Sequence, residues 1–129
     1  MKTIILSTLM LLASLLPADD VMRKEADGTY VINTTTLCSA RGYKKTTPVE
    51  VYISKGKVVK VVPLKNEESK GYFMRVVKHL LPKYQDLKVS KAKKLADKTT
   101  IDGCTGATYS TKAVQKNIKA ALDYYEANK

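Results

Sequence analysis

The chain has 129 residues, of which 44% are hydrophobic and 27% are charged. These values are ordinary for a globular protein, and the length predicts one domain with one modest core. The formal net charge is +11, yet only three basic residues are arginines, and the other twenty are lysines. Because bidentate contacts to bases and phosphates favour arginine, the composition argues against nucleic-acid binding. It remains compatible with an acidic protein partner or with association with an anionic membrane surface.

Residues 1–18 have the composition of a secretory signal peptide. Lys2 precedes a continuous apolar stretch over residues 4–16, and the small residue Ala18 stands before a polar run. The apolar stretch is shorter than the ~20 residues of a spanning helix. We therefore predict an exported protein, periplasmic or at the cell surface, with residues 19–129 as its mature domain. The alternative is an uncleaved anchor that holds the domain at the outer face of the membrane.

Two segments predict antiparallel strands. Residues 29–38 are rich in β-branched side chains and are expected to contain one strand. Residues 49–54 alternate between apolar and polar, Lys55 and Gly56 form a turn, and residues 58–62 return as a second arm. This hairpin is expected to form the core scaffold, with the first arm half buried and the return arm more fully buried.

Three helices are expected in the second half of the chain. The first runs from about residue 72 to 81 and ends at Pro82, and a short lysine-rich helix over 89–96 is expected to be peripheral. The last runs from about 110 to 126, with a buried stripe of Val114, Ile118, Ala121, Leu122 and Tyr125. The fold class is therefore α+β, a small antiparallel sheet with packed helices. The only histidine, His79, is expected at the surface.

The stretch that leads into the last helix carries the chemistry. Residues 102–111 read Asp-Gly-Cys-Thr-Gly-Ala-Thr-Tyr-Ser-Thr, which places glycines and hydroxyls before a helix N-terminus. The free N–H groups and positive dipole end of a first helical turn favour an anionic group such as phosphate. The stretch is neither a P-loop nor a G-x-G-x-x-G motif. The alternative interpretation is a helix cap made by Thr108 or Ser110.

This stretch resembles the flavinylation motif of the FMN-binding domain family. The matching residues are Asp102, Thr105, Gly106, Ala107, Thr108 and Ser110. The resemblance implies that Thr108 carries FMN through a phosphoester bond and that a flavin transferase attaches it. It also implies that Asp102 either engages the transferase and its metal or holds the loop.

A second resemblance to the same family lies in residues 65–73, a loop that in relatives lies against the flavin. Glu68, Ser69 and Tyr72 fit the pattern and are predicted to contact the cofactor, whereas Lys70 stands where a proline is usual. The lost proline is expected to leave the loop less rigid. An aromatic side chain such as that of Tyr72 suits a flat flavin ring, although it could also pack in the core.

The resemblance implies an exported electron carrier, related to the FMN-carrying subunits of ion-pumping NADH:quinone and ferredoxin:NAD oxidoreductases. Its partners would be the flavin transferase and membrane or extracytoplasmic redox proteins. No Ser/His/Asp arrangement and no metal-ligand spacing points to a stand-alone enzyme. The competing interpretation is a module of the cell envelope that binds FMN or another ligand without a covalent bond.

Cys38 and Cys104 are the only cysteines. In an exported protein an even number favours a disulfide, here one that would brace the motif loop. The alternatives are two separate buried thiols, or a dithiol that passes electrons to the flavin.

Overall fold

The computed structural model describes residues 21–129, apart from 43–44, 69, 99–100, 102–103 and 105–106. Four strands form one sheet in the order β1-β2-β3-β4, each antiparallel to the next. They are β1 (Met22–Lys24), β2 (Tyr30–Asn33), β3 (Val49–Ser54) and β4 (Lys57–Pro63). Together with the helices this confirms the predicted α+β class. The predicted signal peptide, residues 1–18, lies outside the described residues.

The β3–β4 hairpin forms where the sequence predicts it. Lys55 and Gly56 both have positive φ angles, 54° and 75°, as a two-residue hairpin turn with right-handed strand twist requires. The first arm is half buried as expected, with buried and partly exposed residues in alternation, but the fuller burial expected of the return arm was wrong. Val49, Val51 and Ile53 of β3 are fully buried, whereas Val59 of β4 is 41% exposed. The reason is position, since β3 lies inside the sheet and β4 forms its edge.

The predicted helix over 72–81 is a longer segment with three successive geometries. It comprises the α-helix α2 (Lys70–Arg75), the π-helical turn η2 (Val76–Leu80) and the 3-10 turn η3 (Leu81–Tyr84). Pro82 does not end the segment, because it occupies the first turn of η3. A missing N–H group is tolerated there, since the first N–H groups of a helical segment have no partner within it.

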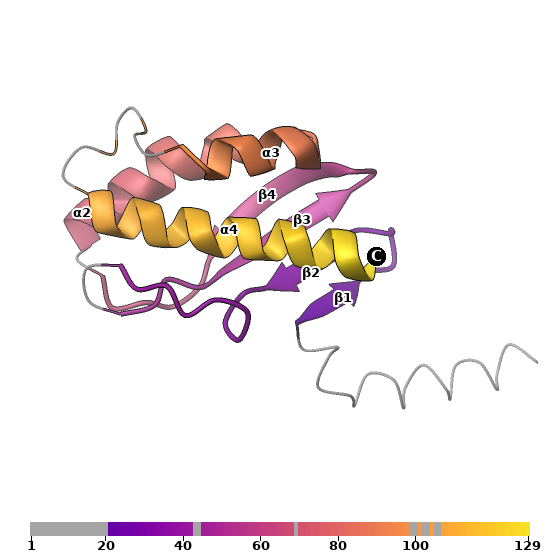
Figure 1. Cartoon of the computed structure of the whole chain (residues 1–129), viewed down its shortest axis with the longest axis horizontal. Coiled ribbons are helices and arrows are strands. Elements are labelled where there is room, and N and C mark those ends of the chain that lie inside the picture. Colours follow the sequence, from indigo (N-terminus) through magenta and orange to yellow (C-terminus); the bar gives the residue numbers. More distant parts are fainter. Residues whose placement is uncertain (1–20, 43–44, 69, 99–100, 102–103, 105–106) are drawn as a thin grey trace, which may run out of the picture.

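The helices α3 (Val89–Ala96) and α4 (Thr108–Asn128) complete the helical layer (Figure 1). α4 lies along β2 and β3, while α3 and η3 contact β4. α3 is not peripheral as expected, because it packs against α4 and buries Val89 and Ala92. All five residues of the predicted α4 stripe are buried, and His79 is exposed as predicted.

The core lies between α4 and the sheet, where fully buried side chains of β2 and β3 meet the apolar stripe of α4. One polar pair is buried among them. Thr34 Oγ1 donates to Asn117 Oδ1 at 2.6 Å, and Asn117 Nδ2 donates to the carbonyl of Ala113 at 2.8 Å. Because both amide ends of Asn117 are bonded, burial carries little penalty, and α4 is held at one register on the sheet.

Both cysteines are free thiols, so the favoured disulfide is not formed. Cys104 is buried, and its Sγ donates to the carbonyl oxygen of Arg75 at 3.7 Å. Cys38 is only partly buried. This arrangement corresponds most closely to the alternative of two separate thiols.

Candidate functional site

The start of α4 differs from its interior in exposure and in capping. Ala107, the residue before the helix, is 3% exposed, and Thr108 is the exposed first residue. Within the described part of the chain no side chain caps the helix, and its first turn contains no acidic residue. The interpretation of Thr108 or Ser110 as a side-chain cap is therefore not supported. An uncapped helix start leaves N–H groups that suit an anionic oxygen.

Three aliphatic hydroxyl groups, those of the serine and threonine side chains, lie within the first turn of α4, and they differ in access to solvent. Ser110 is 3% exposed and Thr111 is 4% exposed, whereas Thr108 is exposed. Each residue of an α-helix is rotated by about 100° from the previous one, so Thr108 and Ser110 face directions about 160° apart. Among these three, only Thr108 is open to an approaching reagent.

Ser110 is held by a buried carboxylate from a distant part of the chain. Its Oγ donates to Glu68 Oε1 at 2.5 Å, and the backbone N–H of Lys45 donates to Glu68 Oε2 at 3.4 Å. Glu68 is 7% exposed, and its own N–H donates to Asn66 Oδ1 at 3.0 Å. A buried carboxylate is stable only when such donors compensate its lost hydration. Glu68 thus joins the 65–68 loop to the first turn of α4.

Gly42 provides the space for this carboxylate. A Cβ atom at Gly42 would lie 2.1 Å from Glu68 Oε1 and 2.8 Å from Glu68 Cδ. The turn that contains Gly42 is closed by a bond from its N–H to the carbonyl of Lys45 at 2.9 Å and by pairing of Arg41 with Thr46. Any larger residue would displace the carboxylate or the turn. The sequence pattern predicts only a turn at Gly42, because the closeness of Gly42 to Glu68 arises from the tertiary fold.

Two buried hydroxyl oxygens in the described residues have no hydrogen-bond partner, Thr47 Oγ1 and Thr111 Oγ1. Leaving such a group unsatisfied costs about 1–3 kcal/mol. Thr111 lies three residues after Thr108, and Thr47 follows the turn that covers Glu68. Both orphaned hydroxyls therefore lie in segments that surround the helix start, which fits a site that makes further polar contacts when a ligand is bound.

A second polar chain fixes the segment before the motif. The hydroxyl of Tyr84 donates to Gln115 Oε1 at 2.9 Å, and Gln115 Nε2 donates to the carbonyl of Lys98 at 2.6 Å. Tyr84 is fully buried, and this burial raises the pKa of its hydroxyl above the ordinary value. The bonds tie η3, α4 and the start of the 98–107 connection together. Gln115 was missed in the sequence, although a polar residue next to Val114 in the buried stripe is the signal that could have found it.

The predicted site residues have different outcomes. The structure joins Ser110 to Glu68, and places Ala107 and Thr108 at the helix start. Tyr72 lies in α2, but only its backbone is described. The remaining predicted contacts, Ser69, Asp102, Thr105 and Gly106, lie outside the described residues.

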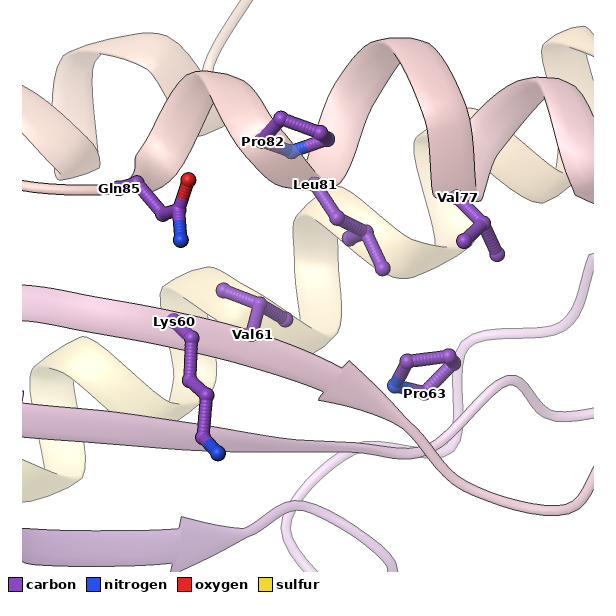
Figure 2. A pocket seen from close by; sticks show the side chains of 7 residues that line it. All are labelled: Lys60, Val61, Pro63, Val77, Leu81, Pro82 and Gln85. Atoms are coloured by element: carbon purple, nitrogen blue, oxygen red, sulfur yellow. The ribbon is translucent and has the colours of Figure 1, made fainter.

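A hollow of about 180 Å³ lies elsewhere, between β4 and the η2–η3 segment (Figure 2). Val77 and Leu81 of the helical segment face Val61 and Pro63 of the strand. The hollow contains none of the residues predicted to bind the cofactor. In the described residues, no group of three or more His, Cys, Asp or Glu side chains is arranged to hold a metal ion. The same part of the chain contains no helix with both the length and the apolar character needed to cross a bilayer.

Comparison with known proteins identifies a family. A family model described as FMN-binding domain matches residues 42–123. The match begins at Gly42, includes Glu68 and Ser110, and extends into α4, so it covers the contacts described above. Neither the curated proteins nor the solved structures contain a significant match to this chain.

Proposed function

Because the chain belongs to the FMN-binding domain family, we propose that it is an extracytoplasmic electron-transfer protein that carries FMN in phosphoester linkage to Thr108. Binding of FMN follows from membership of the family. The covalent bond, the export and the electron-transfer role are the further steps of the proposal.

The observation that carries the proposal is the difference among the hydroxyls at the start of α4. Ser110 is buried and bonded to Glu68, and Thr111 is buried, whereas Thr108 is exposed. A transferase can reach a hydroxyl only if it is exposed to solvent. Attachment forms a bond from Thr108 Oγ to the flavin phosphorus, releases the hydroxyl proton to a base, and displaces the leaving group of the flavin donor.

The described residues fit a phosphate ester at this position. Among the described residues no side chain caps the helix and no acid lies in its first turn, so its N–H groups and dipole favour the negative phosphate. The orphaned hydroxyl of Thr111 supplies a further donor within one helical turn of Thr108. When bound, FMN supplies reversible acceptance and release of electrons. The chain's own residues hold the phosphate and orient the loop beside it.

Besides the cofactor contact that the resemblance implies, Glu68 forms contacts that point to a positioning role. Its carboxylate binds Ser110 and the backbone of Lys45, and it thereby holds the 65–68 loop against the helix that presents Thr108. We propose that Glu68 orients this loop relative to Thr108. Rigid placement of a binding loop lowers the entropy lost when a ligand is ordered.

The export step rests on residues 1–18, which have a basic start, an apolar stretch and a small residue before a polar run. The mature chain is then expected to begin at Asp19. N-terminal sequencing of the protein purified from its native cell checks this directly. An intact Met1 on a membrane-bound protein would favour the uncleaved anchor instead.

The covalent bond is tested by coexpression with a flavin transferase, followed by gel electrophoresis under denaturing conditions. Flavin fluorescence that stays on the band, with an added mass of FMN minus water, is expected for the wild type. Thr108→Ala should abolish both signals, whereas Thr36→Ala, a matched change at another exposed threonine, should preserve them. Flavin that is released on denaturation would show non-covalent binding and overturn the linkage.

A further inference from the structure

A concave surface rich in lysine lies beside the proposed flavin site. It is a hollow of about 230 Å³ between the end of α3 and α4, and we call it the lysine groove. The residues that line it are Ala96, Asp97, Lys98, Lys112, Gln115, Lys116 and Lys119. Four of these seven side chains are lysines, and the single acid, Asp97, is paired with Lys119 at 3.1 Å.

The groove lies on the same side of α4 as Thr108. Residues separated by four, seven, eight and eleven positions share one face of an α-helix, and these are the separations of Lys112, Gln115, Lys116 and Lys119 from Thr108. The groove begins about 6 Å along the helix axis from Thr108, at a rise of 1.5 Å per residue. A protein seated on the groove would therefore lie next to the residue proposed to carry the flavin.

The wall of the groove is fixed rather than formed by loose surface chains. Gln115 is 2% exposed, and it holds the backbone of Lys98 at 2.6 Å while it accepts the bond from Tyr84. The 96–98 segment is therefore attached to α4. Next to Thr108, Tyr109 is 67% exposed, and tyrosine is enriched among the residues that contribute most to binding at protein interfaces.

The charge of this surface selects the partner. α4 contains no acidic residue from Thr108 to Leu122, and the one acid of the groove pairs with Lys119, so the other three lysines leave the groove with a net positive charge. From these observations we propose that the lysine groove is a docking surface for an acidic electron-carrier protein that exchanges electrons with the flavin on Thr108. This inference rests on the proposed function. Complementary charge accelerates such encounters and orients them, and electron-transfer interfaces are typically small.

Stopped-flow kinetics with reduced flavodoxin, a small acidic carrier, test the proposal on the flavinylated mature protein. Each productive encounter moves one electron from the flavodoxin to the bound flavin. The variant Lys98→Gln/Lys112→Gln/Lys116→Gln should lower the second-order rate about tenfold at low salt, and the loss should vanish at high salt. The matched variant Lys57→Gln/Lys78→Gln/Lys83→Gln removes three exposed lysines elsewhere and should leave most of the rate. Equal losses in both variants would overturn the docking surface.

A second titration separates this proposal from the flavin proposal. Oxidised flavodoxin is added to Thr108→Ala protein, and amide shifts of α4 are followed by NMR. Because docking depends on the lysines, the shifts should gather on residues 109–119 even without flavin. Shifts spread evenly over the surface would overturn the groove, whether or not Thr108 carries FMN. The groove variant can also be tested for binding to anionic vesicles and to duplex DNA. If it loses more binding to either of these than to flavodoxin, the docking proposal is overturned.

Discussion

The two halves of α4 bury different kinds of side chain. From Thr108 to Asn117 four of the six buried residues are polar, Ser110, Thr111, Gln115 and Asn117, and the other two are Ala113 and Val114. From Ile118 onward the buried residues are Ile118, Ala121, Leu122 and Tyr125. In the first half, three of these polar side chains form hydrogen bonds to segments distant in sequence, whereas the second half stabilises the sheet packing by apolar burial. One helix therefore provides the site at one end and the stability at the other.

The largest effect is expected in the second half. Leu122→Ala removes a fully buried side chain, and it should lower the free energy of unfolding by about 2–5 kcal/mol. Flavin per folded molecule should not change, because Leu122 lies almost four turns from Thr108. Urea unfolding and flavin absorbance measure the two quantities, with Lys91→Ala, an exposed change in α3, as the control. A loss of flavin that exceeds the loss of folded protein would show that the second half of α4 also contributes to the flavin site.

The next effect is expected at the contact between Gly42, Glu68 and Ser110. Ser110→Ala removes a bond to a buried carboxylate and should cost about 1.5–3 kcal/mol. Gly42→Ala should displace the same carboxylate and cost about 1–3 kcal/mol. Because both changes break one contact, the double variant should lose less than the sum of the two. Additive losses in urea unfolding would show that the two residues act independently.

A smaller effect is expected at Tyr84. Burial raises the pKa of its hydroxyl above the ordinary tyrosine value near 10. The folded protein therefore keeps this proton to higher pH than the unfolded chain does, and stability is lost as the pH rises above about 10. Tyr84→Phe should cost about 1 kcal/mol at neutral pH and should make this alkaline loss shallower. Parallel pH dependences of unfolding in both proteins would contradict the assignment.

The smallest effect is expected at Thr111. Thr111→Val removes an orphaned hydroxyl at almost constant volume, so the flavin-free protein should gain up to about 1 kcal/mol. The flavinylated protein should gain less, because the hydroxyl then has a partner in the phosphate. Thermal unfolding of both forms measures this difference. An equal gain in stability in both forms would show that the Thr111 hydroxyl does not bind the phosphate.

The features that sequence predicts well depend on local patterns. The β3–β4 hairpin follows from alternation and a two-residue turn, and the second half of α4 follows from helical spacing of apolar residues. β1 was missed, because its three residues are mostly exposed and form a strand only by pairing with β2. The greater burial of β3 than of β4 depends on strand order, which the hairpin pattern does not contain.

The candidate site shows the same limit. The motif identified Thr108 and Ser110 but not their different exposure, since this depends on the carboxylate of Glu68, which comes from 42 residues earlier. Gly42 and Gln115 were missed as site residues for the same reason. Their roles arise from contacts across the fold with Glu68, Lys98 and Tyr84, none of which is adjacent in sequence.

Peptide mapping of the protein from its native cell tests the central claim most directly. Cleavage after Lys98 and Lys112 isolates residues 99–112, which contain every hydroxyl of the motif. Fragmentation of this peptide should place the mass of FMN minus water on Thr108. The same mass on Thr105, Ser110 or Thr111, or an unmodified peptide from cells with an active flavin transferase, would contradict the account.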